Sequence, residues 1–190
     1  MTAADDFQAA MEKLADDTAA QARRIANRRN ITKADKVVRL AGLLNRANAA
    51  ATALADDHTR RQIEALTGRA VPARGIPATD DSERLLKAVK TVLAGPDSPL
   101  ERAERLARSE PLATAQSTVT EAATGQRVRG GYLGWMRKLD ADPCERCRWW
   151  ARNGRVWPAS HRMPRHPSCR CVQELVISPT KPKPVRIKKR

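Results

Sequence analysis

All four cysteines of the chain lie in two short runs, Cys144-Glu145-Arg146-Cys147 and His166-Pro167-Ser168-Cys169-Arg170-Cys171. The Cys-x-x-Cys spacing sets two thiolates about one turn apart, and a second run across a short loop can complete a tetrahedral metal site. Thiolate and imidazole ligands favour zinc over magnesium, calcium or manganese, which prefer oxygen. The sequence therefore predicts a small module that is held together by Zn²⁺.

More candidate ligands are present than a four-coordinate metal needs. The candidates are Cys144, Cys147, His166, Cys169 and Cys171. One of the last three is surplus, and the spacing does not say which. His161 is a sixth and weaker candidate.

Two other interpretations of the cysteines are open. Disulfides would suit a secreted domain, but residues 1–20 hold five acids and one lysine, without the apolar segment of a signal peptide. A redox Cys-x-x-Cys normally begins a helix, whereas this pair follows Asp142-Pro143 and is expected among short loops. Metal-binding thiols in a reducing compartment are therefore favoured.

The large side chains are concentrated around these cysteines. Five of the six aromatic residues are Tyr132, Trp135, Trp149, Trp150 and Trp157, and only Phe7 lies elsewhere. A small zinc unit gains most of its stability from the metal and a few aromatic side chains. Trp149 and Trp150 are therefore expected to pack over the metal site rather than to stack on nucleic-acid bases.

The formal net charge of +15 points to a polyanionic partner such as double-stranded DNA. Residues 178–190 form a predicted basic, proline-rich, flexible tail, whose cations are candidates for polyanion contact: Lys181, Lys183, Arg186, Lys188, Lys189 and Arg190. No apolar run approaches the length that spans a bilayer. Neither a membrane nor a small-molecule substrate is expected among the partners.

Residues before the cysteine module have the periodicity of amphipathic helices. Thr32 with Asp35 marks a helix start, and Ser98-Pro99 marks another. Pro111 predicts a kink or restart in the latter helix. His58, beside Asp56-Asp57, is expected to be solvated. The predicted helices cover residues 3–28, 32–66, 81–94 and 98–123.

These observations define an α+β protein with three parts. Residues 1–126 form a mainly helical region with a hinge near 68–80, residues 127–177 the aromatic-rich zinc knuckle, and residues 178–190 the tail. Glycines at 130, 131 and 134 predict a twisted hairpin or bulged strand. A last strand is expected near residues 172–177.

Several motifs in residues 131–176, about a quarter of the chain, resemble those of a known family. They are Gly131-Tyr132-Leu133-Gly134-Trp135, Asp140-Ala141-Asp142-Pro143-Cys144-x-x-Cys147, Gly154-x-Val156-Trp157 and His166-Pro167-x-Cys169-Arg170-Cys171. This combination resembles the phage Mu F-like minor head proteins, also called phage head morphogenesis or minor capsid proteins. The resemblance places the five cysteine and histidine candidates at the family's metal-type positions.

The resemblance also implies a function. Such a protein is made in the host cytoplasm and enters the virion, where it associates with the portal protein inside the capsid and assists head assembly or DNA packaging and delivery. A second hypothesis is a nucleic-acid-binding zinc module. A less favoured one is an HNH-like nuclease, because no Asp or Glu between Glu145 and Glu174 is available to hold magnesium. We therefore expect no enzymatic activity.

Overall fold

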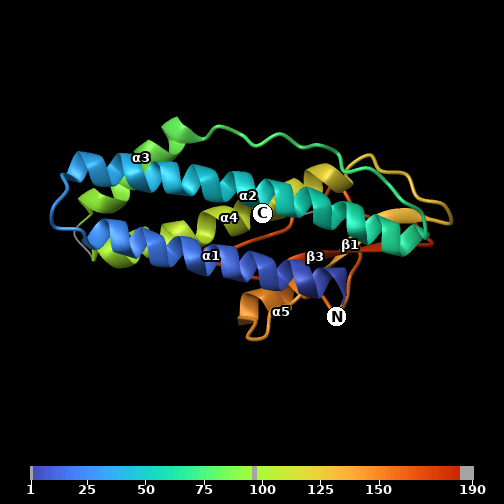
Figure 1. Ribbon diagram of the computed structural model, residues 1–190. Helices are drawn as coiled ribbons and strands as arrows, with labels where there is room; N and C mark the ends of the chain where they lie inside the picture. Colours follow the sequence, from blue (N-terminus) through green and yellow to red (C-terminus); the bar gives the residue numbers. More distant parts are fainter. Residues whose placement is uncertain (1, 96–97, 185–190) are drawn as a thin grey trace.

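The computed structural model describes residues 2–95 and 98–184 and confirms the α+β class (Figure 1). Four of the predicted basic tail residues, Arg186, Lys188, Lys189 and Arg190, lie outside the described residues. In chain order the elements are α1 (Ala3–Asn27), α2 (Lys33–Thr67), α3 (Ser82–Ala94), α4 (Pro99–Ala123), β1 (Tyr132–Lys138), α5 (Glu145–Ala151), β2 (Trp157–Pro158) and β3 (Val172–Ser178).

The long helices begin and end where the sequence supplies caps. The side chains of Thr2 and Thr32 each accept a hydrogen bond from a backbone N–H in the first turn, and the carboxylates of Asp5 and Asp35 accept one from the backbone N–H of the cap residue. These reciprocal bonds satisfy amide groups that a helix start leaves free. Gly68 ends α2 with φ of 65°, a left-handed conformation that glycine adopts without penalty.

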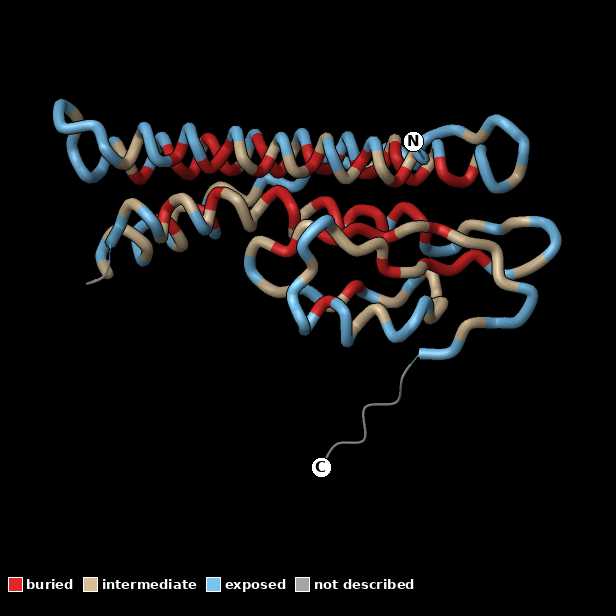
Figure 2. Tube along the Cα trace, turned by 90° about the horizontal axis from the view of Figure 1, so that it is seen from below, coloured by how far each residue is buried: buried red, intermediate tan, exposed pale blue. Residues whose placement is uncertain are grey.

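Helices α1, α2 and α4 pack along their lengths, and the buried positions of α1 and α2 lie on the side facing α4 and the sheet (Figures 1 and 2). Much of this interface is alanine, which lets helix backbones approach closely. The fully buried alanines include Ala15, Ala19, Ala22, Ala51, Ala55 and Ala107. At one end, Leu85 and Val89 of α3 close a leucine-rich cluster with Leu40 and Leu44 of α2. No helix in the described part of the chain is both long and apolar enough to cross a membrane.

Helix α4 does not restart at Pro111, so the restart, one of the two outcomes expected there, is wrong. The helix runs from Pro99 to Ala123 with Pro111 inside it. Pro111 itself is fully buried, next in sequence to Leu112 of the core beside α1. Burial along this face therefore outweighs the loss of one backbone hydrogen bond at the proline.

The sheet has the order β2-β1-β3 and is antiparallel throughout. β1 pairs with β3 over its whole length, from Tyr132 opposite Ser178 to Lys138 opposite Val172. The expected hairpin or bulge at the glycines is therefore wrong. Gly134 instead permits close approach, because a Cβ there would lie 2.6 Å from the carbonyl oxygen of Trp157 in β2.

The edge of β3 that faces away from β1 is held by side chains of α2. The amide of Gln62 accepts a hydrogen bond from the Leu175 N–H at 2.8 Å and donates to the Gln173 carbonyl at 3.4 Å. His58, one turn earlier on α2, is 3% exposed and stacks on Phe7 of α1 with ring centroids 3.9 Å apart. The expectation of a solvated His58 is therefore wrong, because β3 and α1 cover it.

Burial of His58 should make the folded protein sensitive to acid. Burial lowers the pKa of His58 from 6.5 to about 4. Unfolding then takes up a proton between these two pH values, so the associated stability is present above pH 6.5 and is lost as the pH falls. The free energy of unfolding should drop by roughly 3 kcal/mol between pH 6.5 and 4 from this residue.

Urea unfolding of the wild type and of His58→Gln over this pH range measures the effect. The variant should lose less stability on acidification than the wild type does. Equal losses of stability in the two proteins would contradict the prediction that His58 causes the sensitivity to acid.

Candidate metal centre

The cysteines lie on two segments, the start of α5 and the residues just before β3, which the fold brings together. Cys144 is the N-cap residue of α5 and Cys147 lies in its first turn. The expectation that this pair lies among short loops is therefore wrong. Cys169 and Cys171 lie just before β3, which β1 fixes in register. The free thiols are buried except that of Cys144, which is exposed.

All five predicted ligands meet in two overlapping groups. Cys144, Cys147 and His166 form one, Cys147, Cys169 and Cys171 the other, and the ligand atoms within each group lie within 4.8 Å of one another. The His166 Nε2 atom is 3.3 Å from the Cys144 sulfur and 3.1 Å from the Cys147 sulfur. The Cys147 and Cys169 sulfurs are 3.7 Å apart. The cluster can therefore hold a metal ion, with Cys147 common to both groups.

His166 is oriented for binding through one nitrogen. Its Nδ1 atom lies 2.9 Å from the Pro167 carbonyl oxygen, so a proton on Nδ1 leaves Nε2 free to bind a cation. Trp150 of α5 stacks on the imidazole ring, with the two planes inclined by 21°. The expectation that the tryptophans cover the site holds for Trp150. It fails for Trp149, which is 61% exposed.

The loop that carries His166 and Cys169 is fixed on α4. Ser168 has φ of 59°, and its N–H donates to the Ser109 hydroxyl at 3.0 Å. The Gln116 amide donates to the carbonyl oxygens of Cys169 and Cys171 at 3.2 and 2.9 Å. A left-handed conformation in a residue other than glycine costs free energy, and these contacts hold it in place. The helical region thus positions two of the ligands.

Arg137 is the site residue that the sequence-based interpretation missed. This β1 side chain is 7% exposed, and its guanidinium lies 3.7 Å from the Cys147 sulfur and 3.6 Å from the Cys169 sulfur. It also donates to the Pro164 carbonyl and lies over the Trp150 ring. The alternation of β1 contained the signal, because Arg137 is in phase with the buried Leu133 and Trp135.

The three buried thiols differ in acidity. A hydrogen bond from Cys171 lowers the pKa of Cys169 to about 5. Burial and the adjacent Cys169 raise the pKa of Cys147 to about 12, and the pKa of Cys171 is also raised, because its proton is held by Cys169. Cys169 is therefore the thiolate that the protein stabilises by itself. The Cys171 sulfur also lies 3.7 Å from an Asp140 oxygen.

His161, the weaker candidate, belongs to a different environment. Its ring stacks on Trp157 at 4.5 Å between centroids, and its carbonyl oxygen accepts a hydrogen bond from the Trp135 indole. Burial lowers the pKa of His161. It lies in neither of the two ligand groups. Lys181 and Lys183, the described tail candidates, are exposed.

Comparison with known protein families, with characterised proteins and with solved structures finds no match for this chain. The site is therefore interpreted from its own geometry and from the motifs in the sequence.

Replacing Arg137 should weaken metal binding. Its two contacts to sulfur favour the thiolate form that binds a cation, so Arg137→Met should lower metal affinity by about tenfold or more. A spectrophotometric titration with Co²⁺, whose thiolate complexes absorb strongly, measures the affinity.

Lys138→Met is the matched control, because Lys138 is the next residue of β1, carries the same charge and pairs with Asp5 instead of with sulfur. The control should bind Co²⁺ like the wild type. Equal affinities in all three proteins would show that Arg137 does not support the ligands.

Proposed function

We propose that this chain is a structural minor head protein of a tailed phage, held near the portal protein inside the capsid, where it assists head assembly or DNA packaging and delivery. One observation carries the proposal. The cysteine and histidine positions of the family-like motif, which are separated by up to 27 positions between Cys144 and Cys171, converge on one cluster. Residues of a functional metal motif must come together in the folded chain. An accidental match in the sequence carries no such requirement.

The metal that best suits this cluster is zinc. Tetrahedral zinc with ordinary bond lengths sets nitrogen and sulfur ligands about 3.6 Å apart and two sulfurs about 3.8 Å apart. The separations of Cys147 from His166 and from Cys169, 3.1 and 3.7 Å, are close to these values. Our proposed ligands are Cys144, Cys147, His166 and Cys169, which would draw closer together around an ion, because Cys147 belongs to both ligand groups. Cys171 is then the surplus thiol, beside Asp140.

A zinc ion at this position would act as a structural staple. Three thiolates and one imidazole on a divalent ion leave a single negative charge, which the buried guanidinium of Arg137 balances. The ion would join α5 to the loop that α4 supports through Ser109 and Gln116. The module and the helices would thus form one rigid body, which suits a protein that must keep its shape in a large assembly.

A non-catalytic role is consistent with the ligand set. Four protein ligands fill a tetrahedral zinc site and leave no position for a substrate or a reactive water. The basic surplus of the chain is suited to a shell filled with DNA. These features support a structural protein over an HNH-like nuclease.

Protein purified under reducing conditions should contain about one zinc per chain. Cys147→Ser should lose the metal, and the C-terminal module should then unfold, because the binding energy of a structural zinc is also folding energy. Cys171→Ser should keep the metal. Elemental analysis with far-ultraviolet circular dichroism measures both effects.

Two outcomes would contradict this ligand assignment. One is less than about half an equivalent of zinc in the wild type. The other is loss of zinc in Cys171→Ser together with its retention in Cys144→Ser.

In purified phage particles, this chain should sediment with the head at a copy number far below that of the major capsid protein. Particles made without the portal gene should lack it, because the portal is its proposed attachment site. Quantitative mass spectrometry of fractionated heads measures both. A chain found only outside particles would contradict the proposal, as would nuclease activity that His166→Ala abolishes while zinc stays bound.

A further inference from the structure

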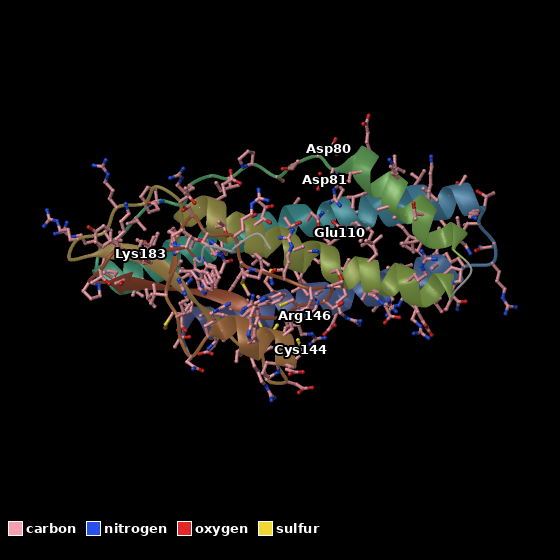
Figure 3. All side chains as sticks on the ribbon, turned by 180° about the vertical axis from the view of Figure 1, so that it is seen from behind. Asp80, Asp81, Glu110, Cys144, Arg146 and Lys183 are labelled. Carbon is pink, nitrogen blue, oxygen red and sulfur yellow. The ribbon has the colours of Figure 1, made fainter. Side chains whose placement is uncertain are left out.

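The surface of α5 and the turn after it carries arginines beside tryptophans, outside the metal centre. Residues 145–155 hold one acid, Glu145, with four arginines and two tryptophans: Arg146, Arg148, Arg152, Arg155, Trp149 and Trp150. Figure 3 shows Arg146 and Cys144 together at α5, away from the acidic residues Asp80 and Asp81 on the opposite side of the molecule. This segment is therefore a basic part of the module's surface.

Trp149 exposes an indole ring that a folded chain normally buries. Its side chain is 61% exposed, the largest fraction for any aromatic residue among those described. The Arg152 guanidinium lies 4.7 Å from the ring centre. A shallow cavity of about 390 Å³ beside it is lined by Glu145, Arg146, Trp149 and Trp150. An exposed ring next to a hollow and a cation can stack on a planar group of a ligand.

The arginines of this surface have no acidic partners. Some arginines elsewhere pair with carboxylates, as Arg84 does with Glu110 at 2.7 Å and Arg108 with Asp16 at 3.0 Å, although others in the described part of the chain do not. Within residues 2–95 and 98–184, none of the four arginines between 146 and 155 forms an ion pair. Their positive charge is thus available to an anionic ligand.

We propose that this α5 surface binds single-stranded nucleic acid, with an unpaired base stacked on Trp149 and phosphates bound by Arg146 and Arg152. The ligand must combine negative charge with planar groups, because the surface combines cations with an exposed indole. A duplex keeps its bases stacked inside and offers Trp149 no partner along its length. An acidic peptide supplies charge but no regular planar group. The binding does not depend on the chain being a head protein.

Fluorescence anisotropy with a labelled single-stranded thymidine oligomer, on the full chain with its metal bound, tests the proposal. Trp149→Ala should weaken binding by about tenfold. Arg146→Gln combined with Arg152→Gln should weaken it and reduce its dependence on salt. The matched control, Arg28→Gln with Arg29→Gln, removes the same charge at the exposed turn between α1 and α2 and should have a much smaller effect.

Four results would overturn the proposal. Unchanged affinity in Trp149→Ala, with metal content and circular dichroism also unchanged, would exclude base stacking. Equal binding of a duplex of the same length would indicate attraction to phosphate alone. Equal weakening by the control with Arg28 and Arg29 replaced would show that affinity follows net charge. If poly-glutamate competed as effectively as unlabelled oligomer, the ligand would be an acidic protein instead.

Discussion

The contact between β3 and the helices is the one on which the rest of the structure depends. A strand at the edge of a sheet leaves every second N–H and carbonyl group without a partner, and burying such groups is costly. Gln62 supplies both a donor and an acceptor to this edge, so β3 can lie directly against α2. The strands and the cysteine segments supply most of the core beside the sheet, and this contact extends that core to the helices. Ile63 and Ala123 of the helices lie in the same cluster as Trp135 and Leu175.

The arrangement of the metal cluster depends on the contact between β3 and the helices. With β3 docked, Cys171 is placed at its start and β1 is placed beside it, so that Arg137 reaches the sulfurs. Helix α5 then places Cys144 and Cys147 beside His166 and Cys169. Positive charge from Arg137 helps the buried Cys169 to ionise and opposes the rise in the pKa of Cys147.

Local features of the fold could be predicted from the sequence, whereas contacts between distant segments could not. The capping residues Thr32 and Gly68 mark the ends of α2 because capping is decided within a few residues. The metal cluster is an exception, because two cysteine runs with ligand spacing predict that they meet on one tetrahedral site. The burial of His58 depends on β3, more than a hundred residues later, and nothing near Asp57 indicates it. Helix α5 escaped prediction because seven residues are too few to show a helical period.

The support that α4 gives to the ligand loop also sets an order of assembly during synthesis. Ser109 and Gln116 precede His166 and Cys171 in the chain, so they leave the ribosome earlier. The helical surface that receives the loop can therefore be folded before the last cysteine emerges. Until then Cys144 and Cys147 have no partners, and their thiols are open to oxidation or to the wrong metal. A preformed helical platform shortens that interval, because the loop meets its docking surface as soon as it is made.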